Sequence, residues 1–206
     1  MDTPETIAAE YIRRNAVIDI GRAVSRGWAL VRDNMPMLVG ASVLAWLITC
    51  VPLVGQLLGF VVMGSLDYMF LRRIRGEEVQ LGDVFAGFNI AFAHLVLAGL
   101  VSGLLTGVGL VLCILPGIYL AVGYVFTLPL VIDKKMDFWP AMEVSRRVVH
   151  HHWWSMLALL IVIGLIAMAG VLVCIVGLFI SIPVATAALM SVYEDLFGQQ
   201  AAASQA

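Results

Sequence analysis

The chain has 206 residues, of which 62% are hydrophobic and 13% are charged, and its mean hydropathy is +0.99. Such an apolar composition lies outside the range of ordinary soluble domains and excludes a water-soluble enzyme. The net charge of -2 leaves no surplus of positive charge to neutralise phosphates, so binding of nucleic acid through bulk charge is excluded as well.

Long uncharged stretches indicate helices that cross a membrane. Side chains of Asp, Glu, Lys and Arg are missing from residues 34–66, 84–132 and 148–193. Each stretch is too long for one crossing of about 20 residues. Each also contains, near its middle, a break with Pro or Gly that follows a cysteine. An all-α fold of three helical hairpins is therefore predicted, with spans at 36–51, 54–72, 90–113, 116–133, 153–174 and 177–196.

Two prolines lie inside these spans rather than at their ends. Pro129 falls in the fourth span and Pro183 in the sixth. Because proline has no N–H, each releases a backbone carbonyl one turn earlier, at Val125 and Phe179. We expect a kink in both helices, with either a structural role or a role as a hinge.

The basic residues predict the orientation of the chain. All 12 Lys and Arg residues lie before the first span or in the connections after the second and fourth spans, and the hairpin turns contain none. Under the positive-inside rule, both long connections are cytoplasmic. We therefore expect a multi-pass protein with both termini on the cytoplasmic side.

The hairpins are spaced as an internal repeat. Cys50, Cys113 and Cys174 lie 63 and 61 residues apart, each just before a hairpin turn. The spacing predicts one integral membrane domain over 1–206, built from three units at about 17–76, 83–135 and 137–198. Because every unit starts on the same side, the units are parallel, unlike the inverted repeats of many transporters.

A cytoplasmic amphipathic helix is expected before each hairpin. In the first unit, an apolar stripe formed by Ile20, Val24 and Val31 runs beside arginines on other faces, which is typical of a helix at the lipid boundary. The basic residues expected to bind anionic lipid headgroups are Arg22, Arg26, Arg32, Lys134, Lys135, Arg146 and Arg147. The alternative is that these residues are ordinary juxtamembrane charges that only set orientation.

Small residues recur at every fourth position on several spans. Gly99, Gly103 and Gly107 form one such line on the third span. Lines of this kind let helix backbones approach closely inside a membrane. They favour packing within the helical bundle, and a homo-oligomer interface is the open alternative.

Few polar groups inside the spans offer any chemistry. Asp67 is the only charged residue well inside a span, and His94 lies at the start of the third span. Asp67 is expected to pair at the interface with Arg72, Arg73 or a basic residue of another unit, and a polar path near Asp67 and His94 is the alternative.

No motif in the chain points to catalysis or to a cofactor. The run His150, His151 and His152 looks at first like a metal site, but consecutive helical residues point about 100° apart and cannot all bind one ion. Followed by two tryptophans, the run is typical of an interfacial belt. No nucleophile elbow, zinc-protease motif or phosphate loop is present. We expect no metal, no cofactor and no enzymatic activity.

Several short segments together resemble a known bacterial group. They are Leu115-Pro116-Gly117-Ile118-Tyr119, Pro129-Leu130-Val131-Ile132-Asp133, Ala141 with Ser145, Trp153-Trp154, and Tyr193-Glu194-Asp195-Leu196. From about residue 20 onward the chain resembles the YciC-like bacterial inner-membrane proteins of unknown function, and the membrane domain associated with some glycerophosphoryl diester phosphodiesterases. The resemblance implies a bacterial cytoplasmic membrane location and six helices, and it carries no catalytic residues.

Two functions remain as hypotheses. The first is a non-enzymatic integral membrane protein that organises anionic lipids or partner proteins through its interfacial helices and close-packed hairpins, with membrane shaping as a more specific version. The second is a small transporter or channel with a polar path near Asp67 and His94.

Overall fold

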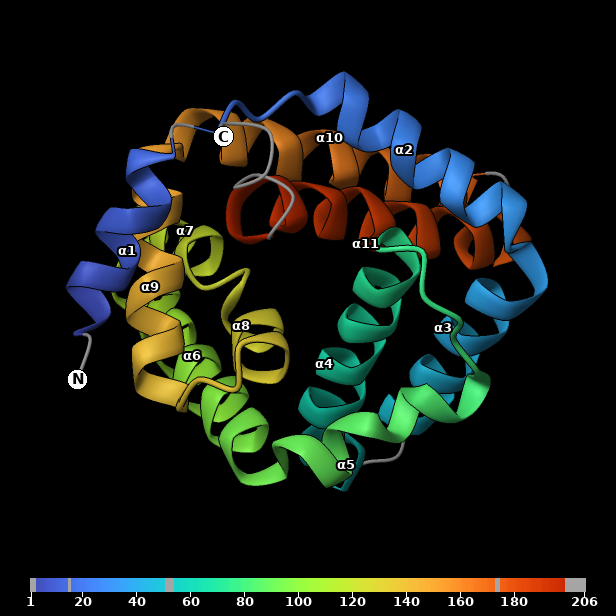
Figure 1. Cartoon of the computed structure of the whole chain (residues 1–206), viewed down its shortest axis with the longest axis horizontal. Helices are drawn as coiled ribbons and strands as arrows, with labels where there is room; N and C mark the ends of the chain where they lie inside the picture. The colour runs from blue at the N-terminus through green and yellow to red at the C-terminus, as the bar shows by residue number, and fades with distance from the viewer. Residues whose placement is uncertain (1–2, 15, 51–53, 173–174, 199–206) are drawn as a thin grey trace.

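The computed structural model describes residues 3–14, 16–50, 54–172 and 175–198, and in these ranges it is helical and contains no strand. The expected all-α class is confirmed. The helices are α1 (Pro4–Arg13), α2 (Ile20–Asp33), α3 (Met35–Thr49), α4 (Val54–Ile74), the 3-10 helix η1 (Leu81–Phe85), α5 (Ala86–Ile90), α6 (Phe92–Leu112), α7 (Ile114–Gly123), α8 (Thr127–Asp133), α9 (Phe138–His151), α10 (Trp153–Leu172) and α11 (Ile175–Phe197) (Figure 1).

Four helical segments of the described chain are long and apolar enough to cross a membrane: Phe92–Leu112, Ile114–Asp133, Trp153–Val171 and Phe179–Phe197. They coincide with the third to sixth predicted spans. The first two predicted spans, 36–51 and 54–72, are not among them. At 15 residues, α3 is about 22 Å long, shorter than the hydrocarbon core of about 30 Å. Helix α4 has 21 residues but contains Asp67 and carries Arg72 and Arg73 in its last turn.

The turn of the middle hairpin is one residue long. Cys113 alone separates α6 from α7, in an extended conformation with φ −165° and ψ 134°. Gly109 and Gly117 let the two helices meet there, because a Cβ at Gly109 would lie 3.1 Å from the Cα of Gly117. The turns predicted near Cys50 and Cys174 lie partly outside the described residues.

The predicted fourth span is broken rather than continuous. Helix α7 ends at Gly123, and α8 begins at Thr127 after three residues of turn. The interruption precedes Pro129, which cannot donate to a carbonyl one turn back. By contrast, α11 runs unbroken through Pro183 as a helix. The sequence predicted a kink at each proline. In the fourth span the structure shows a break ahead of Pro129, whereas α11 is one helix across Pro183, and a kink in α11 stays a prediction.

Helix α2 precedes the pair α3 and α4, η1 with α5 precedes α6 and α7, and α9 precedes α10 and α11. Each of these preceding segments contacts a helix pair other than the one that follows it. Helix α2 lies along α11, η1 and α5 contact α4, and α9 contacts α7 and α8 (Figure 1). Gly27 of α2 is buried, and a Cβ there would lie 2.7 Å from the backbone nitrogen of Ala188. At the second contact, the N–H of Gly87 donates to the hydroxyl of Ser65 at 2.8 Å. A small residue thus allows close approach at each of these two contacts.

At the third contact, between α9 and the helices α7 and α8, the small residue is Ser145. Its hydroxyl donates to the carbonyl of Gly123 at 2.7 Å and accepts from the N–H of Phe126 at 3.3 Å. These bonds satisfy backbone groups that the break between α7 and α8 leaves without helical partners. Gly27, Gly87 and Ser145 are spaced 60 and 58 residues apart along the chain.

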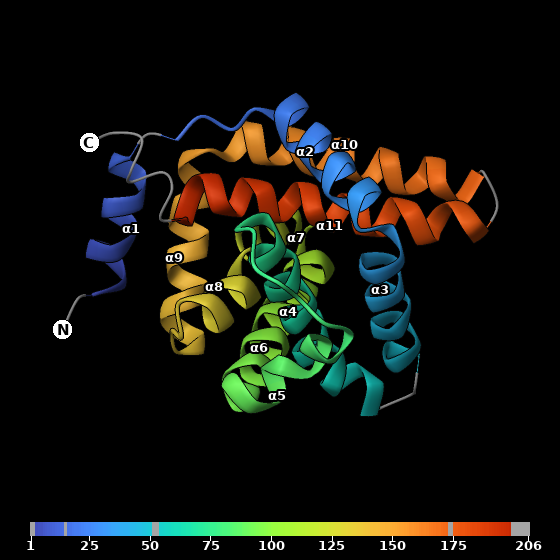
Figure 2. The same ribbon diagram turned by 45° about the vertical axis from the view of Figure 1, so that its right-hand side comes forward.

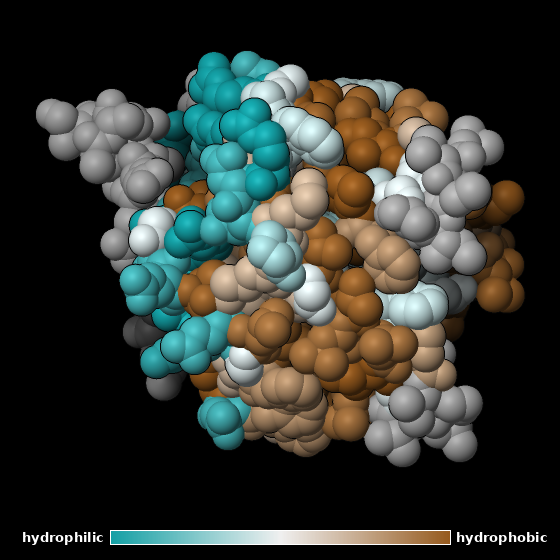
Figure 3. Space-filling model, turned by 90° about the vertical axis from the view of Figure 1, so that its right-hand side faces the viewer, coloured by the Kyte–Doolittle hydropathy of each residue, from teal (hydrophilic) through white to brown (hydrophobic). Residues whose placement is uncertain are grey.

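The outer surface of the molecule is largely apolar. Figure 3 shows hydrophobic residues over most of one side, with hydrophilic residues gathered along one edge. Large hydrophobic side chains are exposed along α6 and α10, including Leu104, Val111, Leu165 and Met168. Helices α10 and α11 lie side by side across the molecule, and their far ends project beyond the other helices (Figure 2), so much of α10 lies at the surface. This distribution suits a protein surrounded by lipid.

The small-residue line on α6 has two different environments. A Cβ at Gly99 would clash with the ring of Phe60 on α4, so this glycine permits contact within the molecule. A Cβ at Gly103 or Gly107 would meet nothing within 4 Å among the described residues. These two glycines line a shallow outward groove with Val108 and Leu112. Packing within the bundle therefore accounts for a glycine at position 99 but not for the glycines at positions 103 and 107.

Candidate functional site at the polar ends of the helices

A cluster of charged side chains joins the ends of three helices far apart in sequence. Arg75 follows α4, Asp133 is the last residue of α8, and Glu194 lies near the end of α11. The Arg75 guanidinium donates to both carboxylate oxygens of Asp133, at 2.6 and 3.2 Å, and through Nε to Glu194 at 2.9 Å. The hydroxyl of Tyr193 donates to Asp133 at 3.0 Å.

The cluster is largely shielded from solvent. The side chains of Asp133 and Glu194 are 5% and 6% exposed. Lys134 lies 3.4 Å from Asp133, so two basic groups face two carboxylates and the cluster is neutral. Burial by itself lowers the pKa of Arg75, but its hydrogen bonds to Asp133 and Glu194 outweigh this effect and raise the pKa well above the ordinary value. The guanidinium is therefore charged throughout the physiological range.

Sequence reasoning missed this cluster. Arg75, Asp133 and Glu194 resemble ordinary charges at the ends of spans, and only their spacing of 58 and 61 residues could have indicated that they occupy related positions. An aromatic cluster adjoins these charged residues through Tyr193, whose hydroxyl binds Asp133. The centroid of the Phe126 ring is 5.7 Å from that of Tyr193 and 5.6 Å from that of Phe197. The cluster and the rings together fasten three helix ends, which is a structural role.

The predicted headgroup-binding residues on α2 lie on its exposed face, each beside an acidic residue. Arg22 and Arg32 are 61% and 64% exposed, and their partners are Asp19 at 3.4 Å and Asp33 at 3.2 Å. Arg26 binds Asp195 of α11 at 2.9 Å. Neighbouring pairs this exposed are weak in water, so the arginines of α2 stay accessible to another anion.

The other predicted basic residues divide between two places. Lys134 belongs to the buried cluster, and Lys135 is exposed and left-handed, with φ 51°. Arg146 and Arg147 lie together on α9, and both bind the carboxylate of Glu143, at 2.9 and 2.6 Å. The seven residues therefore do not form one site, and only the two arginines of α9 share a pocket.

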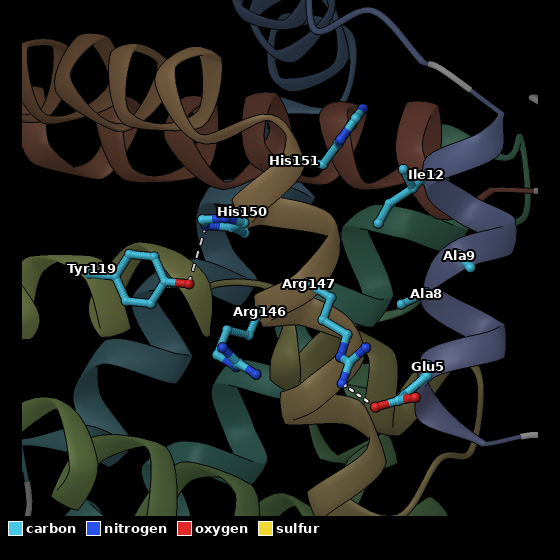
Figure 4. A pocket seen from close by; sticks show the side chains of 9 residues that line it. All are labelled: Glu5, Ala8, Ala9, Ile12, Tyr119, Arg146, Arg147, His150 and His151. Atoms are coloured by element: carbon cyan, nitrogen blue, oxygen red, sulfur yellow. Dashed lines mark hydrogen bonds and ion pairs between the residues drawn. The ribbon is translucent and has the colours of Figure 1, made fainter.

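That pocket lies between α1, α7 and α9 and has a volume of about 340 Å³. Figure 4 shows Arg146, Arg147, His150 and His151 on α9, with Tyr119 of α7 on one side and α1 on the other. The Tyr119 hydroxyl is 3.3 Å from Nδ1 of His150. Glu5 of α1 accepts a hydrogen bond of 2.6 Å from Arg147. The sequence indicated the arginines, but not the contribution of α1.

Asp67 and His94 have separate environments. No hydrogen bond or ion pair joins Asp67 to any residue that the structure describes. The expected pairing with Arg72, Arg73 or a basic residue of another unit is absent among the described residues. Arg72 binds Glu77 at 2.7 Å and Asp83 at 3.2 Å, and Arg73 donates to the carbonyl of Glu77 at 3.4 Å. Nε2 of His94 instead lies 3.5 Å from Asp137, and its Nδ1 is buried without a partner in the described chain. A polar path through both residues stays a prediction.

The histidine run lies at the junction of α9 and α10. Within the described ranges, no group of three or more His, Cys, Asp or Glu side chains is placed to hold a metal ion. Burial and the neighbouring His151 lower the pKa of His152, which favours its neutral form. Cys50 and Cys113 are exposed thiols, and Cys174 lies outside the described residues.

The helical fold, the apolar surface and the four long apolar helices define a membrane protein. Residues 100–195 match the family model described as the membrane domain of glycerophosphoryl diester phosphodiesterase. This match covers just under half of the chain, from the middle of α6 to near the end of α11, and it confirms the predicted resemblance to that domain. The resemblance to YciC-like proteins stays a prediction. No curated protein and no solved structure gives a match.

Proposed function

We propose that this protein is a non-enzymatic membrane protein that organises anionic lipids along its polar edge through α2 and α9. The observation that carries the proposal is that an exposed tryptophan accompanies arginines on both helices, exposed arginines on α2 and half-buried ones on α9. Trp28 of α2 and Trp139 of α9 are 48% and 58% exposed. Indole rings favour the boundary between headgroups and acyl chains, and nearby arginines attract anionic headgroups.

The proposed architecture has six crossing helices in three hairpin units around an axis along the membrane normal. Two observations support it: the equivalent spacing of Gly27, Gly87 and Ser145, and the convergence of Arg75, Asp133 and Glu194 at three helix ends. In this arrangement α3 and α4 form the first hairpin, in which the short α3 crosses a locally thinned bilayer.

The proposed location is the bacterial cytoplasmic membrane, with both termini on the cytoplasmic side. The gathering of hydrophilic residues along one edge supports a single polar side (Figure 3). The outward glycines Gly103 and Gly107 leave a homo-oligomer open. The matched family's description links such membrane domains to an enzyme of glycerophosphoryl diesters, which accords with a setting among phospholipids.

The test is native mass spectrometry of the protein in nanodiscs of phosphatidylcholine with or without phosphatidylglycerol. The double variant R22Q/R32Q is expected to retain about threefold to tenfold less phosphatidylglycerol than the original chain, since each surface cation contributes up to about 1 kcal/mol. R22K/R32K preserves the charge and is the matched control. Equal retention of phosphatidylglycerol and phosphatidylcholine by the original chain would contradict the proposal.

One observation favours the second candidate, a small transporter or channel. Asp67 is a carboxylate on α4 without a hydrogen-bonded partner among the described residues, and such groups inside membranes mark ion paths. Proton or cation flux into liposomes that falls on Asp67→Asn substitution would support transport. Unchanged flux in that variant would leave lipid organisation as the function.

A further inference from the structure

In the pocket between α1, α7 and α9, helix α9 supplies two arginines but one carboxylate, and α1 supplies the second carboxylate. Arg146 contacts Glu143 through three hydrogen bonds of 2.9 to 3.2 Å, and Arg147 contacts the same carboxylate at 2.6 Å. One carboxylate thus serves two guanidinium groups. The second negative charge comes from Glu5 of α1, which accepts from Nη2 of Arg147 at 2.6 Å (Figure 4).

Helix α1 is a short element with a narrow attachment. It has 10 residues, and its principal helix contact is with α9. Ala8 is its one buried residue, and the ring of Tyr11 meets the edge of Phe197 at 5.0 Å. Non-helical residues 16–19 separate α1 from α2. A helix attached in this way can move without disturbing the hairpins, because most of its surface is not part of the core.

We infer that this pocket binds the phosphate group of an anionic amphiphile or phosphate ester, and that α1 is its lid, with the Glu5 carboxylate in the position of a phosphate oxygen. Guanidinium forks match the oxygens of a phosphate, which also accepts from tyrosine and histidine donors. Tyr119, His150 and His151 supply such groups on the remaining wall. The inference rests on the proposed function, since it places one headgroup of that function in a defined pocket.

A second cavity adjoins the pocket and gives room for the apolar part of an amphiphile. This cavity of about 480 Å³ shares Tyr119, His150 and His151 with the first and continues to Trp153, Trp154 and Ser155. These last residues begin α10, a helix that is long and apolar enough to cross the membrane. Together the two cavities have a polar end at α9 and an apolar end at the start of a span.

If Glu5 competes with phosphate, removing its charge should strengthen lipid binding, whereas removing an ordinary contact would weaken it. If Glu5 fills the phosphate position, Glu5→Gln removes the competitor and tightens binding of phosphatidylglycerol, by up to about fivefold for a pair worth about 1 kcal/mol. Glu10→Gln is the matched control, because Glu10 lies on the same helix, pairs with Arg14 at 2.7 Å and does not line the pocket. Arg147→Gln added to the Glu5 variant is expected to remove the gain.

The measurements use the full chain in nanodiscs of phosphatidylcholine with or without phosphatidylglycerol. Retained phosphatidylglycerol is read by native mass spectrometry, and opening of α1 by hydrogen exchange of residues 4–13. Ligand is expected to speed exchange of α1 in the original chain. Titration with inorganic phosphate alone distinguishes the source of the phosphate: faster exchange with phosphate shows that the free anion suffices, and a response to phosphatidylglycerol alone shows that the ligand is a lipid.

Three results would overturn the inference. They are equal affinities in the Glu5→Gln and Glu10→Gln variants, slower exchange of α1 on ligand binding, and no response of α1 to either phosphatidylglycerol or phosphate. Failure here is distinct from failure of the proposed function, because the test of that function changes Arg22 and Arg32 of α2, which do not line this pocket. If R22Q/R32Q lowers lipid retention while the two glutamate variants behave alike, only the pocket and its lid are refuted.

Discussion

The hydroxyl of Ser145 on α9 donates a hydrogen bond of 2.7 Å to the carbonyl of Gly123, the last residue of α7. The same hydroxyl accepts from the N–H of Phe126, so one buried side chain satisfies both sides of the break between α7 and α8. The helix that leads into the third hairpin is therefore fastened to the backbone of the second hairpin, at the point where that hairpin departs from helical geometry.

Ser145→Ala is expected to destabilise the protein by about 1–3 kcal/mol, because two buried backbone groups lose their partner. Thermal unfolding in detergent measures the change. Ser25→Ala is the matched control, since the exposed Ser25 hydroxyl donates only to a carbonyl of its own helix. An equally small effect of both substitutions would show that the Ser145 bonds contribute little.

Arg75→Gln is expected to cost about 3–5 kcal/mol, because it removes the guanidinium that the nearly buried carboxylates of Asp133 and Glu194 share and leaves Lys134 beside Asp133 alone. The same unfolding measurement applies. Adding Asp133→Asn and Glu194→Gln to this variant removes the uncompensated charges and is expected to recover part of the loss. If the triple variant is less stable than the single one, burial of uncompensated charge is not the cause of the loss.

Gly87→Ala is expected to destabilise by about 1–3 kcal/mol through overpacking. Its Cβ would lie 2.5 Å from the hydroxyl of Ser65 and 3.0 Å from the carbonyl of Val61. Gly82→Ala is the matched control in the preceding 3-10 helix, where a Cβ meets nothing within 4 Å among the described atoms. The quantity to measure is the difference between the unfolding temperatures of the two variants. Equal unfolding temperatures would show that α4 and α5 shift apart at little cost to admit the added methyl group.

Acid is expected to weaken the attachment of the α9 arginines. Burial alone raises the pKa of Glu143, but hydrogen bonds from Arg147 and Arg146 outweigh it and hold the pKa below the ordinary value of 4.5. A lowered pKa contributes stability that is fully present above pH 4.5 and is lost as the pH falls through the folded-state value. Glu143→Gln should therefore reduce the dependence of the unfolding temperature on pH in this acidic range. An unchanged slope would assign the acid sensitivity to other carboxylates.

Much of the helical architecture could be predicted because it depends on local properties. An uncharged stretch of about 20 residues specifies a helix that can cross lipid, and Pro or Gly specifies its end. The predicted spans at 90–113 and 153–174 accordingly agree with α6 and α10 to within a few residues. Near Val125 the sequence predicted a kink but not the break at Tyr124–Phe126, since that break needs Ser145 from a separate helix to satisfy its backbone.

The candidate site was predicted less completely. The arginines Arg146 and Arg147 are visible as a basic pair beside a span, and the sequence analysis named them. The cluster of Arg75 with Asp133 and Glu194 was missed, as was the approach of Glu5 to Arg147, because both depend on contacts between residues 58 to 142 positions apart.

The sequence by itself determined that this chain is helical, that it is apolar enough to enter a membrane and where its charges lie along the chain. Only the tertiary structure decided which acid neutralises which arginine. Arg26 meets Asp195 across 169 positions, and Arg147 meets Glu5 across 142. Hydropathy is a sum over neighbouring residues, whereas an ion pair requires two groups within about 4 Å, and only the folded helices bring these groups that close.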